Sequence, residues 1–97
     1  MDTPIFTWEP RKDAANQRKH GISFGEAQSV FLDDDALLLD DPDHSEAADR
    51  SLLIGLSQQL RILVVAHCYR ASDAEIRLIS DRRASRSEPR RYAARGH

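Results

Sequence analysis

Five consecutive apolar residues, Ile62 to Ala66, constrain the fold more than any other stretch of this sequence. An apolar run of this length is typical of a central β-strand that is covered on both faces. Strand-like segments at 51–56 and 75–80 flank it, and the linkers between the three segments have the length of hairpin turns. The second half of the chain is therefore expected to form an antiparallel sheet with residues 62–69 in its middle.

The first half of the chain predicts a short strand followed by two helices. A β-prone run at 5–8 precedes Pro10, which suits the first position of a helix because its missing N–H would be unpaired there. That helix is expected to end before Gly21, which supplies the left-handed position that follows many helices. Ser23 and Glu26 form a capping box that opens the second helix.

Apolar spacing and turn signals complete the predicted order of elements. The second helix carries a core stripe at Phe24, Ala27, Val30 and Phe31. A short strand is predicted at 36–39, before an acidic loop at 40–49. The chain is thus predicted to be one α+β domain over residues 1–97, in the order β-α-α-β-β-β-β-α.

The last element of that order is an arginine-rich C-terminal helix. Ser85 and Glu88 have the spacing of a capping box, and Tyr92 lies within the helix that would follow. Pro89 falls just beyond the free N–H positions, so the first turn is expected to be distorted or the helix to start later.

Composition limits the class of protein to which the chain can belong. Ninety-seven residues, 40% of them hydrophobic and 31% charged, suit one soluble globular domain. No stretch approaches the roughly 20 apolar residues of a membrane helix, and the first ten residues show no signal pattern, so we expect a cytoplasmic protein without membrane contact. Cys68 is the only cysteine and is interpreted as a small structural residue.

Charge is distributed unevenly along the chain. Residues 33–49 contain eight acidic side chains and no basic one, whereas residues 50–97 contain ten arginines against four acids. Arginine suits bidentate contact with phosphate. A solvated basic helix would give the same composition, so the excess of arginine leaves that interpretation and a polyanion site about equally supported.

A row of functional side chains is predicted across the three central strands. If the first hairpin turns at Gln58 and Gln59, Arg50 faces His67. If the second hairpin turns at residues 71–73, His67 in turn faces Arg77. Tyr69 and Glu75 would then be paired one step further along the same face.

Such a row matches the needs of metal-free RNA cleavage. The reaction requires a base for the ribose 2′-OH, cations for the developing phosphorane charge and an acid for the leaving oxygen. We assign proton transfer to His67 and phosphate binding to Arg50 and Arg77. Glu75 is a second candidate base, and an aromatic side chain is the candidate acid or stacking partner. A lone strand histidine is more often a hydrogen-bonded structural residue, and that alternative stays open.

Two aromatic residues and several further cations are placed around this centre. Tyr69 or Tyr92 would stack on a base or act as the acid. The exposed basic residues expected to contact RNA are Arg82, Arg83, Arg86, Lys12 and Lys19. Lys12, Asn16 and Lys19 share one helical face, which an ordinary solvated helix also shows.

Other candidate sites have simpler interpretations. His20 lies at a helix end, where its charge would favour the helix dipole. His44 lies among Asp41, Asp43 and Glu46, but without a recognisable metal-loop spacing it is interpreted as part of a solvated acidic turn. The sequence has no P-loop, dinucleotide-binding glycine pattern or zinc-ligand set, so we expect no cofactor and no metal.

One set of residues between Phe6 and Tyr92 has the order and spacing of a known family. The set comprises Phe6, Trp8, Pro10, Lys12, Asn16, Lys19-His20-Gly21, Ser23-Phe24, Glu26-Ala27, Val30-Phe31, Asp41-Pro42, His44-Ser45, Arg50, Ile54-Gly55, Ile76-Arg77, Ile79-Ser80, Arg83-Ala84, Glu88 and Tyr92. With these residues the chain closely resembles the BrnT toxins, which belong to the wider RelE-like group of ribonucleases.

The resemblance implies a fold, an activity and a partner. It implies a RelE-like fold, a ribonuclease that inhibits translation, and neutralisation by a BrnA-type antitoxin that contacts operator DNA. It also implies a basic and aromatic site at Arg77, Arg83 and Tyr92. Pro89 and Asp81 depart from the family pattern, so a non-catalytic toxin-fold module that acts mainly in an antitoxin complex is the alternative function. A purely structural assembly protein is a third possibility, for which the sequence offers no repeat or heptad.

Overall fold

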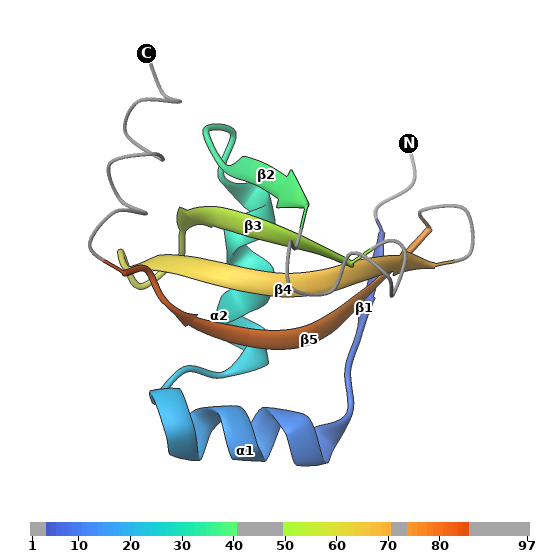
Figure 1. The fold of residues 1–97 in the computed structure, drawn as a ribbon, viewed down its shortest axis with the longest axis vertical. Helices are drawn as coiled ribbons and strands as arrows, with labels where there is room; N and C mark the ends of the chain where they lie inside the picture. Colours follow the sequence, from blue (N-terminus) through green and yellow to red (C-terminus); the bar gives the residue numbers. More distant parts are fainter. Residues whose placement is uncertain (1–3, 41–49, 71–73, 86–97) are drawn as a thin grey trace.

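The structure, a computed structural model, describes residues 4–40, 50–70 and 74–85 as a five-stranded sheet with helices packed on it (Figure 1). The strands have the spatial order β1-β5-β4-β3-β2. In chain order the elements are β1 (Ile5–Thr7), α1 (Pro10–His20), α2 (Phe24–Ser29), the 3₁₀ turn η1 (Val30–Leu32), β2 (Leu37–Asp40), β3 (Arg50–Leu56), β4 (Ile62–Arg70) and β5 (Glu75–Arg83). The predicted α+β class is confirmed, whereas the predicted C-terminal helix lies outside the described residues.

The helix ends follow the local signals in the sequence. Pro10 is the first residue of α1, and Gly21 follows the helix with a φ of 71° and donates its N–H to the Gln17 carbonyl at 2.8 Å. The Ser23 hydroxyl accepts the N–H of Glu26 at 3.1 Å and so caps α2. These predicted ends are confirmed.

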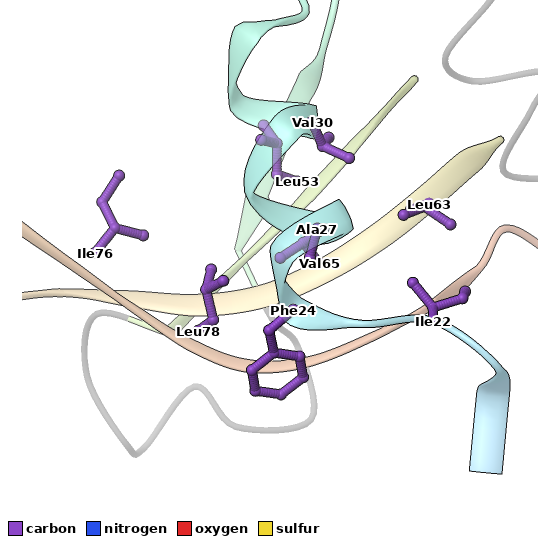
Figure 2. Packing of buried hydrophobic residues seen from close by; sticks show 9 residues of the cluster. All are labelled: Ile22, Phe24, Ala27, Val30, Leu53, Leu63, Val65, Ile76 and Leu78. Atoms are coloured by element: carbon purple, nitrogen blue, oxygen red, sulfur yellow. The ribbon is translucent and has the colours of Figure 1, made fainter. Parts of the chain in front are cut away.

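The core lies between α2 and one face of the sheet. Phe24, Ala27 and Val30 are fully buried, as their spacing on one helical stripe predicts. Figure 2 shows these side chains packed over residues of the strands beneath them. The strand residues in this cluster are Leu53, Leu63, Val65, Ile76 and Leu78. We call this side of the sheet the helix face.

β4 is the central strand and is covered on both sides. Leu63 and Val65 point to the helix face, while Val64 and Ala66 point to the other side, and all four are buried. The prediction that 62–66 forms a central strand is confirmed. We call the side opposite α2, to which Val64 and Ala66 point, the arginine face.

Gly55 allows a close approach between β3 and the segment after α2. A Cβ atom at this position would lie 2.8 Å from Val30 Cγ1 and 3.0 Å from the Ala36 Cβ. Both distances are shorter than normal carbon contacts, so a larger residue would push η1 away from the sheet.

The first hairpin differs from the predicted one by a single residue. Its strands end at the pair Leu56 and Ile62, with a turn in which the Leu60 N–H donates to the Ser57 carbonyl at 2.9 Å. Leu60 has a φ of 63°, which is typical of the last position of a three-residue hairpin loop. The prediction of a two-residue turn at Gln58 and Gln59 is wrong, because glycine or asparagine normally marks this left-handed position and leucine gives no such signal.

The second hairpin is shifted as well. Arg70 pairs with Glu75, and the register changes again at an irregularity between Ala66 and His67. His67 consequently lies opposite Leu78.

Among the described residues, no helix is long and apolar enough to cross a membrane.

Candidate functional site

The predicted row of Arg50, His67 and Arg77 does not exist in the structure. Arg50 and Arg77 both pair with Cys68, whereas His67 is the neighbouring residue of β4 and therefore points to the opposite face. The predicted Tyr69–Glu75 pair is also wrong, since Tyr69 pairs with Ile76. Near His67, each hairpin is shifted by one residue relative to its predicted register. The side chains of this part of β4 therefore lie on the face opposite to the predicted one, relative to the side chains of β3 and β5.

The structure places a different row, Arg50–Cys68–Arg77, on the arginine face. Two steps between adjacent strands separate Arg50 from Arg77, which puts their backbones about 10 Å apart. Both arginines and Cys68 are partly exposed. Long guanidinium side chains from the two strands that flank β4 can therefore converge above Cys68 on one phosphate group.

Glu75 lies beside this row and is held by a neighbouring strand. The Thr7 hydroxyl of β1 donates to Glu75 Oε2 at 2.6 Å. Glu75 is two residues from Arg77 on β5 and pairs with Arg70 on β4, so all three side chains lie on the arginine face. The face thus brings a positioned carboxylate next to several guanidinium groups.

His67 is a buried residue of the helix face. It is 0% exposed, and its ring makes edge contacts with the rings of Phe31 and Tyr69 at centroid distances of 4.9 and 5.1 Å. Nδ1 donates to the Val65 carbonyl at 3.0 Å, and Nε2 accepts from the Tyr69 hydroxyl at 3.3 Å. Burial lowers the pKa of His67, which keeps the ring neutral. These contacts are those of a structural histidine.

Tyr69 shares the environment of His67. It is partly buried against the core cluster, and its hydroxyl is the partner of the His67 ring. Its position on the helix face separates it from Arg50 and Arg77. The structure therefore does not bring Tyr69, one of the two predicted stacking residues, together with the predicted phosphate-binding residues.

The predicted peripheral cations are spread over different surfaces. Arg82 pairs with Val64 and lies on the arginine face, about 16 Å along β5 from Arg77. Arg83 pairs with Leu63 and lies on the helix face. Lys12 and Lys19 are exposed on α1, which packs beyond the β5 edge of the sheet (Figure 1). Only Arg82 among these four extends the surface around Arg77.

Several predicted residues lie outside the described residues. These are Tyr92 and Arg86 in the predicted C-terminal helix, its Glu88 and Pro89, and His44 in the acidic segment. The assignment of Tyr92 as acid or stacking residue and of Arg86 as an RNA contact stays a prediction.

A buried polar pair that the sequence interpretation missed joins α1 to β5. Asn16 Oδ1 accepts the backbone N–H of Asp81 at 3.1 Å, and Asn16 Nδ2 donates to Asp81 Oδ1 and to the Ile22 carbonyl. The amide of Asn16 thus satisfies a backbone group on the part of β5 that β1 does not cover. α1 has no apolar stripe, and this was the signal that the helix packs through polar contacts.

Asp81 is the second member of this pair and carries an unusual proton affinity. It is 1% exposed, and within the described part of the chain its Oδ2 has no hydrogen-bond partner. Burial raises the pKa of Asp81 to about 7, although the bond from Asn16 favours the ionised form. The acid that departs from the family pattern is therefore a buried structural group on the helix face.

Glu26 is a second buried acid, and both of its carboxylate oxygens accept hydrogen bonds. Arg61 donates to both carboxylate oxygens of Glu26, with Nε at 2.9 Å from Oε2, and the Ser57 hydroxyl donates at 2.6 Å. The Arg61 hydrogen bonds lower the pKa of Glu26. In the predicted capping box Glu26 was expected to turn back towards Ser23, but its side chain instead ties α2 to the β3–β4 hairpin.

Comparison with known proteins supplies the family. The model of the family "Ribonuclease toxin, BrnT, of type II toxin-antitoxin system" matches residues 8–88. The crystal structure of the Brucella abortus ribonuclease toxin BrnT superposes with a TM-score of 0.67 at 27% sequence identity, covering 87% of this chain and all of that one. None of the curated protein sequences compared with the chain matches it significantly. The family match spans most of the sequence, and the chain belongs to the BrnT family of ribonuclease toxins of type II toxin–antitoxin systems.

Proposed function

We propose that this chain is an endoribonuclease that cleaves RNA on the arginine face without a metal ion and thereby inhibits translation. The observation that carries the proposal is the shared register of Arg50, Cys68 and Arg77, with Glu75 on the same face. Membership of a ribonuclease toxin family supports the reaction class. The wider assignment to the RelE-like group and neutralisation by a BrnA-type antitoxin belong to the same proposal.

The arrangement supplies most of the groups that the reaction needs. Glu75, positioned by Thr7, takes the proton from a ribose 2′-OH, and the resulting oxygen attacks the adjacent phosphorus. Arg50 and Arg77 stabilise the negative charge that grows on the phosphorane oxygens. The 5′-oxygen then leaves and takes up a proton, for which Tyr92 is the candidate donor. His67 has no step in this scheme.

A direct experiment incubates the purified chain with total RNA in the presence of EDTA. Cleavage by the wild-type chain and its loss in Glu75→Gln are the expected results, because glutamine keeps the shape of the side chain but cannot accept the proton. Induction of the wild-type chain should also arrest growth and reduce protein synthesis. Intact RNA in EDTA, together with normal growth on induction, would overturn the proposal and favour the non-catalytic module.

The lone cysteine provides an independent test of where RNA binds. Cys68 is partly exposed between Arg50 and Arg77, so a thiol reagent can report on this point of the surface without any added label. A non-cleavable oligonucleotide with 2′-deoxy substitutions should slow the modification of Cys68 several-fold, and high salt should restore the rate. An unchanged rate at saturating oligonucleotide would place RNA elsewhere.

A further inference from the structure

A groove runs along α2 and η1 and is also lined by residues of β1 and of the β3–β4 hairpin. Two adjoining cavities of about 250 and 300 Å³ share Ser29, Leu32 and Gln58 in their walls. The first continues to Asp33 and Leu56, and the second continues to Gly25 and Phe6. Because they share three residues, the two cavities form one groove, which we call the α2 groove.

One wall of the α2 groove is formed by successive residues of α2 and η1. Gly25, Gln28 and Ser29 lie at the positions i, i+3 and i+4 of α2, and Leu32 follows in the 3₁₀ turn η1. Leu32 is 83% exposed, and Leu56 is also exposed at the rim. An amphipathic helix can lay apolar anchors against such a surface, and the small side chains at Gly25 and Ser29 leave room for it.

The charge around the groove favours a cationic occupant. Asp33 lines it, and the exposed Asp34 and Asp35 follow directly in the chain. Asp33 also accepts the N–H groups of Asp35 and Leu56, which fixes the carboxylate at the rim. Phosphate groups of RNA would be repelled here, whereas lysine and arginine side chains flanking an apolar stripe would be attracted.

We propose that the α2 groove is the docking site for the antitoxin and receives a basic amphipathic helix of that partner. This inference rests on the proposed function only in taking the partner of the chain to be an antitoxin, as a type II toxin family implies. The groove lies on the helix face and the arginine row on the other, so partner binding and RNA cleavage use separate residues.

Two substitutions test the groove without disturbing the core. In Gly25→Leu the new Cβ would meet the Ser23 hydroxyl at an ordinary 3.7 Å and no other atom of the described residues within 4 Å, so we expect the side chain to fill the groove instead of clashing. Leu32→Asp replaces a side chain that is already in water. Ala15→Leu is the matched control for Gly25→Leu, because Ala15 is exposed on α1 and lines neither cavity.

The first measurement is the Kd between each variant and the protein encoded by the reading frame next to the gene of this chain. RNA cleavage by each variant is measured separately. Gly25→Leu and Leu32→Asp should each weaken binding at least tenfold with cleavage unchanged, while Ala15→Leu binds like the wild type. An Asp34→Asn/Asp35→Asn double variant, confined to exposed side chains, should weaken binding severalfold at low salt and less at high salt.

Three results would overturn the inference. The first is an unchanged affinity for the partner in both groove variants, and the second is failure of the wild-type chain to bind this protein. The third is loss of RNA cleavage with intact partner binding in Leu32→Asp, because this result would assign the groove to RNA. If a groove variant unfolds, the Asp34→Asn/Asp35→Asn double variant still tests the inference. A Kd that is the same in this double variant as in the wild type would contradict a basic occupant. If the chain binds its partner through the groove but never cleaves RNA, the docking site stands and the proposed function falls.

Discussion

The two faces of the sheet are built from alternate residues of the same strands, yet their polar side chains differ in burial and in the contacts they make. The helix face buries His67 and Asp81 under helices, where each is held by a few fixed hydrogen bonds. The arginine face carries partly exposed side chains such as Arg77 and Glu75. Neighbouring residues such as His67 and Cys68 therefore differ in environment, with His67 packed in the core and Cys68 partly exposed on the face proposed to bind RNA. The comparison shows that residue type alone did not tell which of these side chains is buried and which is partly exposed, whereas the face of the sheet does.

The largest expected effect is on stability, from the helix face. His67→Ala should lower the free energy of unfolding by about 3 kcal/mol, because it leaves a cavity and removes a partner from the Val65 carbonyl and the Tyr69 hydroxyl. Cys68→Ala, the next residue on the other face, should cost less than about 1 kcal/mol. Urea denaturation of both variants measures the difference.

A second substitution of His67 tests whether this residue takes part in RNA cleavage. His67→Phe keeps most of the packing and should still cleave RNA, with a rate per folded molecule close to that of the wild type. A loss of cleavage in folded His67→Phe would restore the histidine to the active site and break the distinction between the faces.

The next effect in size is catalytic and compares two arginines on one strand. Arg77→Ala should lower kcat by about 100-fold, equivalent to about 2.7 kcal/mol, because a cation that stabilises the transition state is removed. Arg83→Ala, on the helix face of the same strand, should change kcat less than threefold. Initial rates on a short RNA, with melting temperatures as a check of folding, give both numbers. Equal losses in the two variants would contradict the assignment of the site to one face.

A third effect is the pH dependence of stability that Asp81 creates. Its pKa in the folded chain, about 7, lies above the value of 3.8 for a free side chain, so the folded state binds the proton more tightly than the unfolded state. Stability is therefore highest at low pH with respect to this group and falls as pH rises through this range, by about 2–3 kcal/mol between pH 5 and 8.

The control for this prediction is Asp81→Asn, which keeps an acceptor for Asn16 but cannot ionise. The variant should lose this part of the pH dependence and be more stable than the wild type at pH 8. Unfolding curves at pH 5, 6.5 and 8 measure the slope, and parallel curves for the two proteins would rule out Asp81 as its source.

The smallest expected effect concerns the position of Glu75. Thr7→Val removes the hydroxyl that donates to Oε2 while keeping the shape of the side chain, and kcat should fall about tenfold with KM nearly unchanged. Thr7→Ser retains the hydroxyl and should recover most of the activity. A KM effect of the same size as the kcat effect, or no rescue by serine, would argue against a positioning role.

Local signals predicted the elements because each depends on residues close together in the chain. Pro10, Gly21 and Ser23 act within one turn of their helices, and the apolar run at 62–66 needed only its own composition to indicate a central strand. Pairs such as Asn16 and Asp81, 65 residues apart, were beyond such signals. A buried polar pair of this kind forms only when the helix and the strand edge are already adjacent.

The sequence predicted correctly that Arg50 and Arg77 lie on one face, but not which residue of β4 lies between them. Both hairpins were shifted by one residue near Arg50 and Arg77, so the two errors cancelled for β3 and β5 relative to each other, and these arginines remained on one face. Only the central strand changed sides, and Cys68 replaced His67 between them. The left-handed Leu60 that caused the first shift is set by the turn and not by any residue preference.

The sequence by itself determined the α+β class, the helix ends, the central strand and, through its spaced motifs, the toxin family. Tertiary structure alone decided which polar residues meet, which of two neighbouring side chains reaches solvent and where a groove forms beside α2. The physical reason is that side chains alternate along a strand, so a turn that takes up one additional residue exchanges the two faces of the sheet for the residues of the next strand.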